Sequence, residues 1–380
     1  MIRLGHSRAQ DARLAAQEFH AAVAQPDAAL VVFFCSSLYD LDALAEEMAR
    51  LFAGVTVIGC TTAGEIGPAG YCRHSLSGAS FPADTCSAVV GRLDGLQQLE
   101  IARGQAFAAG LLAQLKGRRP EASAGNSFGM LLVDGLSIRE ESVAHTLQSA
   151  LGSLSIVGGS AGDDLKFERT WVYHDGAFRS DCAVLALVST ELPFMAFKTQ
   201  HFVTEDERLV VTEADAGRRT VHEINGLPAA EEYARLIGTS QDGLGPEEFA
   251  AHPIVVLIDG TDYVRSIQKV NPDGSLTFYC AIEEGLVLRV ARGQDIVADL
   301  EHTLARIREL IGPPEFIFSC DCILRHLEME ARQQRDAVAG LLTRNNAVGF
   351  STYGEQYGGV HINQTLTGIA IGRSLETGDV

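Results

Sequence analysis

The chain has 380 residues, of which 46% are hydrophobic and 21% are charged, and its formal net charge is -19. These values are typical of an ordered globular protein with a large core, and the length predicts two domains. The negative charge argues against nucleic acids and anionic lipid surfaces as partners, because binding to either requires clustered Lys and Arg. Small molecules and other proteins remain as the expected partners.

The sequence gives no signal for a membrane helix or a secretory leader. No apolar run approaches the roughly 18 to 20 residues of a membrane span, and residues 1–8 become polar at once. Most of the eight cysteines stand in apolar runs, as reduced, buried thiols do. We therefore expect a cytoplasmic protein. Cys320 and Cys322 could share a metal ion, but neither a second Cys pair nor a close His pair completes a zinc set.

Three stretches of the chain repeat one design, in which two apolar strands flank an amphipathic helix. The strand, helix and strand of these repeats are predicted at 29–34, 41–51 and 55–60, at 130–133, 139–151 and 155–157, and at 316–319, 323–335 and 348–350. Further helices are predicted at 7–24, 104–116 and 295–310. Further strands are predicted at 75–81, 86–91, 170–173, 182–189, 194–203, 208–212, 254–258, 263–270, 275–280, 286–291 and 366–371.

These elements predict an α/β fold with two domains, whose mixed parallel and antiparallel sheets are built partly from the repeated strand–helix–strand units. A turn at 214–217 is followed by a new strand and a helix that starts at a proline, so the domain boundary is placed there. The predicted organisation is an N-terminal helical segment at 1–26, a first domain at 27–216 and a second domain at 217–380.

Each repeat ends in a turn with the pattern [ST]-x-G-[ED]. Right-handed crossovers place all three turns beyond the carboxyl ends of parallel strands, which is where open α/β sheets bind ligands. A glycine beside a short acid is also ordinary turn punctuation, so one such turn alone indicates little. The candidate ligand-binding residues are Thr62, Gly64, Glu65, Ser160, Gly162, Asp163, Thr352, Tyr353, Gly354, Glu355 and Asn363.

Motifs for catalysis are missing. The sequence contains no G-x-S-x-G nucleophile elbow, no G-x-G-x-x-G and no Walker A motif. The acids of the three turns could serve as general acids or bases only if they converge, and spacing does not set their separation. We therefore do not expect an enzyme.

At this point four motifs resemble one family. Residues 59–66, 158–164, 224–229 and 349–356, the last followed by 361–365, are similar to segments of the FIST sensory proteins. The resemblance extends over about 28–372 and covers both the N-terminal and C-terminal FIST regions. It implies a ligand-sensing module of signal transduction, with amino acids or other small molecules as ligands.

Members of similar length resemble haem-binding nitric-oxide sensors that act on a partner histidine kinase, and this is the function that we expect first. Haem b would be bound non-covalently, because no C-x-x-C-H motif is present. Local chemistry leaves two candidate axial ligands open: His201 has the more apolar neighbours and His361 lies nearer the turns. The alternative is a haem-free sensor that binds an amino acid or a similar metabolite, because an acidic edge suits a cation.

Overall fold

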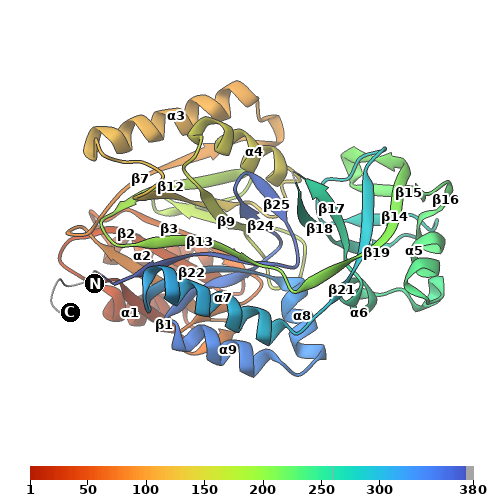
Figure 1. Ribbon diagram of the computed structural model, residues 1–380. Coiled ribbons are helices and arrows are strands. Elements are labelled where there is room, and N and C mark those ends of the chain that lie inside the picture. The colour runs from red at the N-terminus through yellow and green to blue at the C-terminus, as the bar shows by residue number, and fades with distance from the viewer. Residues whose placement is uncertain (259, 374–380) are drawn as a thin grey trace.

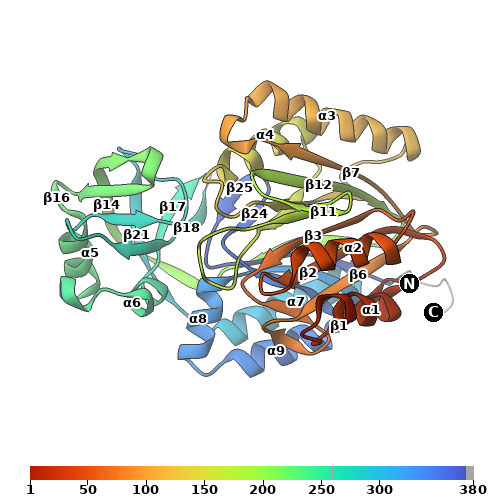
Figure 2. The same cartoon turned by 180° about the vertical axis from the view of Figure 1, so that it is seen from behind.

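The computed structural model describes residues 1–258 and 260–373. It confirms the predicted α/β class with mixed sheets. The described chain forms a body of three similar units, here called the ring, and a smaller part that projects from one end of it, here called the lobe (Figures 1 and 2). The lobe is residues 202–293, and it is inserted between two elements of the third unit.

Each ring unit contains the same succession of elements. The first comprises β1 (Arg3–Ser7), α1 (Ala12–Val23), β2 (Ala28–Ser36), α2 (Leu41–Leu51), β3 (Val57–Thr62), β4 (Glu65–Gly67), β5 (Gly70–Cys72) and β6 (Leu76–Pro82). The second comprises β7 (Cys86–Asp94), α3 (Ile101–Arg118), β8 (Ser127–Val133), α4 (Glu140–Leu151), β9 (Ile156–Ser160), β10 (Val172–His174), β11 (Ala177–Arg179) and β12 (Cys182–Thr190). The third comprises β13 (Phe194–Thr199), α7 (Ile296–Ile311), β22 (Pro314–Cys322), α8 (Ile323–Ala331), α9 (Arg335–Arg344), β23 (Ala347–Thr352), β24 (Glu355–Tyr357), β25 (Val360–Ile362) and β26 (Leu366–Gly372).

The lobe has its own sheet and core. It contains β14 (Phe202–Asp215), β15 (Thr220–Ile224), β16 (Leu227–Pro228), α5 (Ala229–Ile237), α6 (Pro246–Ala251), β17 (Ile254–Ile258), β18 (Thr261–Arg265), β19 (Ile267–Val270), β20 (Leu276–Phe278) and β21 (Val287–Gly293). Its strands pair antiparallel. The predicted domain boundary near residue 216 falls in the turn between β14 and β15, which pair with each other.

The three repeats form parallel strand pairs, as predicted. β2 pairs with β3, β8 with β9, and β22 with β23. The helix predicted at 323–335 is two helices, α8 and α9, because Gln333 takes a left-handed φ of 55° between them. The helix predicted at 7–24 begins only at Ala12, where the Asp11 side chain accepts the Leu14 N–H as an N-cap, and β1 precedes it.

Each unit gives a short hairpin to the next sheet around the ring. The hairpin β4–β5 of the first unit pairs with β23, β24–β25 of the third unit pairs with β9, and β10–β11 of the second unit pairs with β3. The exchange closes on itself, so the ring has an approximate threefold axis. Every unit is therefore tied to both of its neighbours by backbone hydrogen bonds.

The inner faces of the three sheets share one core, and the outer faces are covered by helices. Phe34 stacks on Phe350 at 4.7 Å and on Phe318 at 5.8 Å between ring centroids, which joins the first and third units. The helix pairs α1–α2, α3–α4 and α7–α9 cover the outer faces of the three sheets (Figure 1). This closed core fixes the loops that follow the parallel strands at one end of the ring, where the lobe is attached.

Candidate ligand-binding site

The three predicted turns meet around the threefold axis. At each junction one backbone N–H bonds to a neighbouring unit: Thr61 N to Trp171 O at 2.9 Å, Ser160 N to Gly354 O at 2.8 Å, and Ser351 N to Gly64 O at 2.7 Å. These equivalent bonds place Ser160 at the position of Thr61 and Ser351. The structure therefore brings the three turns together, as the repeat predicted.

The second turn is not equivalent to the other two in its register. Strand β3 pairs with β10 so that Cys60 faces Val172, whereas β23 pairs with β4 so that Phe350 faces Glu65. Val172 therefore stands where the first and third units carry their glutamates. Asp163 belongs to an extra loop of the second unit, and the second copy of the sequence pattern is wrong by one residue as a structural repeat.

The first and third turns hold their glutamates in the same way. Glu65 accepts hydrogen bonds from Thr62 Oγ1 at 2.5 Å and Ser75 Oγ at 2.6 Å. Glu355 accepts from Thr352 Oγ1 and from Thr365 Oγ1, the latter at 2.7 Å. Both carboxyl groups are fully buried, and this burial raises the pKa of each to about 8. The two glutamates are thus neutral below that pH. Their carboxyl oxygens already accept hydrogen bonds from residues of their own units.

Asp163 has a different environment, in which its carboxylate organises the extra loop. It accepts the backbone N–H groups of Phe167, Glu168 and Arg169 at 2.9, 2.7 and 2.9 Å, and the hydroxyl of Tyr353. Although burial opposes ionisation, these donors hold the pKa of Asp163 below its usual value. Asp163 is therefore charged and links the second turn to the third.

The glycines of the turns permit close backbone contact. Gly64 and Gly354 have φ of 141° and 158°, and each donates its N–H to the threonine hydroxyl of its own turn, at 3.2 and 3.1 Å. A Cβ atom on Gly162 would lie 2.6 Å from Ala63 N. The backbone conformation and the close contacts of these turns are therefore enough to explain why the residues are glycines.

Apolar side chains cover the turns on the side of the lobe. Phe167 stacks on Tyr353 at 4.6 Å between ring centroids and lies 6.2 Å from Tyr279 of the lobe. Phe167 remains 37% exposed, so the cover is incomplete. The partly buried side chains packed here are Leu136, Leu165, Tyr279 and Leu327.

His201 stands at the hinge between ring and lobe. Its Nε2 lies 2.8 Å from Glu328 Oε2, and its Nδ1 lies 3.0 Å from Arg325 Nη1. Its backbone carbonyl accepts the N–H of Gln294, at 2.7 Å, so the two strands that connect the lobe to the ring are bonded together. Arg325 is fully buried and also donates to Asp321 Oδ1 at 2.7 Å. Helix α8 therefore holds the hinge through buried charged groups.

His361 lies in the third exchanged hairpin, against the lobe. Its Nδ1 is 3.1 Å from Gln356 Nε2, and its carbonyl accepts from Arg265 Nη1 of the lobe at 2.8 Å. Burial lowers the pKa of His361 to about 4, so the ring is neutral. Its Nε2 has no hydrogen-bond partner among the described residues. Asn363, in the same hairpin, is fully buried and bonds only weakly to Tyr353 O, at 3.5 Å.

Neither histidine fits a haem in this structure. An axial ligand needs a free imidazole nitrogen with room for the porphyrin around the iron. Both nitrogens of His201 are engaged. The free Nε2 of His361 lies against backbone, because a Cβ on Gly354 would lie only 2.6 Å from it, and a porphyrin would overlap that turn.

A groove of about 810 Å³ lies between ring and lobe beside the hinge. One wall is the second half of α8, and the other is α6 with the loop before it. Gln364, one residue after Asn363, donates to the carbonyls of Phe249 and Ala250 in α6, at 3.4 and 3.3 Å, and thereby connects the turn region to this groove. The charged residues that line the groove are Glu247, Glu248, Glu328, Glu330 and Arg332.

A second contact closes the junction on the other side. Arg219 of the lobe lies 2.6 Å from Glu140 and 2.7 Å from Glu141, at the start of α4. The three side chains are largely buried, and burial raises the pKa of Glu140. The lobe is thus held to the ring by the hinge and by this ion-pair contact.

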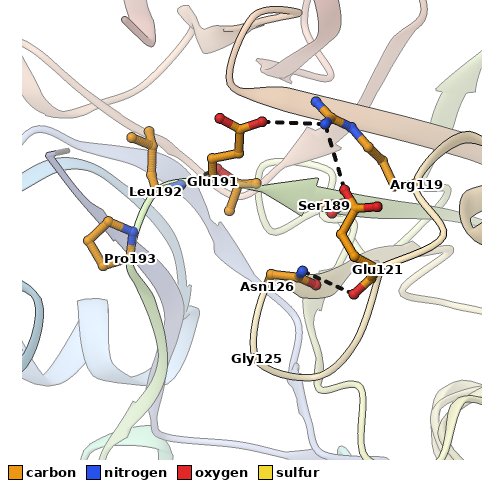
Figure 3. Close-up of a pocket in the computed structure, with 9 residues that line it drawn as sticks. Arg119, Glu121, Gly125, Asn126, Ser189, Glu191, Leu192 and Pro193 are labelled. Atoms are coloured by element: carbon orange, nitrogen blue, oxygen red, sulfur yellow. Dashed lines mark hydrogen bonds and ion pairs between the residues drawn. The ribbon is translucent and has the colours of Figure 1, made fainter.

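Another hollow, of about 540 Å³, lies at the end of the ring away from the turns (Figure 3). It is formed where β12 ends and β8 begins, at Ser189 and Asn126. Its Arg119 is paired with Glu191 at 3.3 Å and Glu121 at 3.7 Å. Its charged groups therefore satisfy one another.

Comparison with known proteins agrees with these features. The FIST N domain profile matches residues 29–227, and the FIST C domain profile matches residues 229–358. The chain belongs to the FIST family. FIST domains are sensory and bind small ligands, which agrees with the expected role as a ligand sensor.

Two similar proteins have little sequence identity to this FIST protein. The uncharacterized protein MJ1623 of Methanocaldococcus jannaschii is 22% identical in an alignment 277 residues long, and the match covers 64% of this chain and 54% of that protein. The chain thus spans about half the length of that relative. A solved structure of a cyanuric acid hydrolase is 12% identical, with coverage of 97% of this chain and 99% of the other and a TM-score of 0.38.

Several residues of the junction were not among the predicted site residues, namely Arg219, Arg265, Arg325, Glu328 and Gln356. The signal that identifies them is the pairing of hairpins and lobe with the ring, which spacing along the chain does not contain. No helix of the described segments is long and apolar enough to span a bilayer. The ligand-binding role of the predicted turn residues stays a prediction.

Proposed function

We propose that this FIST protein is a haem-free sensor of a small metabolite, which binds in the groove between ring and lobe. The observation that carries the proposal is the position of the groove: α6 of the lobe and α8 of the ring form its walls, next to the hinge at His201. A molecule that contacts both walls favours one lobe position, and a ligand shifts an equilibrium by its difference in affinity for the two states.

The lining of the groove suggests the ligand's charge. Four glutamates and one arginine line the groove. Glu328 pairs with Arg332 and Glu330 pairs with Arg73, each at 3.1 Å, which leaves Glu247 and Glu248. Because the remaining charge is negative, the groove favours a ligand that carries an amine, such as an amino acid. Movement of the lobe would pass the signal to a second protein in the cytoplasm, for example a histidine kinase. This mechanism does not require the protein to catalyse a reaction.

Thermal unfolding in the presence of amino acids and related amines tests the proposal. A ligand raises the melting temperature of the wild type. Ala331→Trp fills the groove from the exposed end of α8, so it should abolish that shift. Ala113→Trp, on the exposed face of α3, is the matched control and should keep it. An equal shift in both variants would place the ligand elsewhere.

Haem-dependent nitric-oxide sensing, implied by the family resemblance, is the competing function. Protein expressed with a haem supply distinguishes the two by absorption spectroscopy. Stoichiometric haem with a Soret band would overturn the haem-free proposal, and His201→Ala and His361→Ala would then show whether either residue holds the iron.

A further inference from the structure

The third exchanged hairpin breaks the pattern of the other two. In each hairpin, the second pair of facing residues is buried or partly buried. This pair is Ile66 with Tyr71 in the first unit, and Tyr173 with Phe178 in the second. In the third unit it is Gln356 with His361. The fold thus accepts apolar and aromatic side chains at this place, and a polar pair is not required for folding.

The polar pair is left incompletely bonded. Gln356 Nε2 donates to Ser160 Oγ at 2.8 Å and lies 3.1 Å from His361 Nδ1, but Gln356 Oε1 and His361 Nε2 have no partner in the described chain. The Oδ1 of Asn363 is also buried without one. In the first unit, by contrast, the Tyr71 hydroxyl donates to Asp321. Each unpartnered buried polar group costs free energy, because it has lost its hydrogen bonds to water without a replacement.

The three side chains that carry these atoms adjoin one another, since Gln356 Nε2 also lies 3.1 Å from His361 Nδ1. A Cβ on Gly354 would lie 2.6 Å from His361 Nε2 and 2.9 Å from Asn363 Nδ2, so both side chains converge on that glycine. The lobe covers them, because Arg265 bonds to the carbonyl of His361. Access to these atoms therefore requires the lobe strand β18 to lift.

The donors and acceptors of these side chains determine which chemical group could bind to them. If Gln356 Nε2 donates to Nδ1 of a neutral His361, the proton of the imidazole is on Nε2, which is then a donor. The two amide oxygens are acceptors. A neutral amide group presents N–H donors and a carbonyl acceptor together, whereas a carboxylate offers acceptors alone.

We infer that Gln356, His361 and Asn363 form a binding site for the amide group of a small molecule, with its N–H donated to the Gln356 and Asn363 oxygens and its carbonyl accepting from His361 Nε2. The inference goes beyond the proposed function, because it describes a second binding site that is separate from the groove. No covalent step is involved.

Two buried asparagines give a test that needs no ligand. Asn345 is bonded on both sides, by Arg308 Nη2 at 2.7 Å and to Leu341 O at 2.7 Å, so Asn345→Leu should lower the melting temperature by about 2–4 °C. Asn363→Leu removes an unpartnered oxygen, so it should leave the melting temperature of the free protein unchanged or higher. Equal losses in both variants would overturn the inference.

Binding is tested with benzamide, benzoate and methyl benzoate as probes. Benzamide alone should shift the His361 imidazole ¹⁵N resonances and raise the melting temperature, and Asn363→Leu should abolish both effects. A response to benzoate or methyl benzoate as large as that to benzamide, or no response to benzamide, would refute the assigned chemistry. Ala331→Trp should keep the benzamide response, which separates this site from the groove.

Discussion

The buried glutamates predict how the stability of the protein depends on pH. Burial raises the pKa of Glu355 from 4.5 to about 8. Between these values the folded protein binds more protons than the unfolded chain, so the free energy of unfolding falls as the pH rises. From about pH 5 to about pH 8 the loss for this one residue is roughly 3 kcal/mol. Glu355→Gln removes the ionisable group, and its amide can still bond to Thr352 and Thr365.

Urea unfolding at a series of pH values is the assay. The wild type should lose stability steeply toward pH 8, and Glu355→Gln should lose roughly 3 kcal/mol less over the same range. Glu65→Gln should behave alike, because Glu65 has the equivalent bonds and also a pKa raised to about 8. The exposed Glu301→Gln variant controls for the substitution itself. If wild type and Glu355→Gln show the same pH dependence, the carboxyl group is not held neutral.

Two further predictions concern the hinge and the extra loop. Arg325→Met leaves the buried Asp321 without its cation, so unfolding measurements should show a loss of about 3–5 kcal/mol, whereas Arg13→Met, in an exposed ion pair, should change stability little. Tyr353→Phe removes the hydroxyl that bonds to Asp163 and accepts the Leu165 N–H at 3.0 Å, so amide hydrogen exchange should accelerate at Leu165 and over residues 167–169. Unchanged exchange there would mean that Asp163 holds the loop by itself.

The parallel strand pairs were predictable because each repeat is local in sequence. A buried strand, a crossover helix of about three turns and a second buried strand leave few arrangements, and the structure has all three pairs. The same reasoning placed the turns at one end of the ring. It could not give the partners of the turns' side chains, because Ser75 and Thr365 follow the glutamates by ten residues and return only through the hairpins.

The sequence pattern failed where an insertion imitates a repeat. Ser160 to Asp163 repeats the letters of the first turn, but the strand register places Val172 at the position of Glu65. The pattern cannot reveal this, because serine, glycine and aspartate also suit an ordinary loop that binds backbone N–H groups. Only the pairing of β10 with β3 distinguishes the two cases.

The exchange of hairpins gives a reason for the proposed amide site to lie in the third unit. Each hairpin must fill the same place on a neighbouring sheet, so the three units share the requirements of the fold. The lobe is inserted in the chain of the third unit, and it lies against the third hairpin through Arg265 and His361. Polar residues can replace the apolar pair there without loss of the ring, because the third hairpin still pairs with β9 through its backbone. A difference between units that the fold does not demand is a guide to the site, and here it points to Gln356, which is not among the predicted site residues.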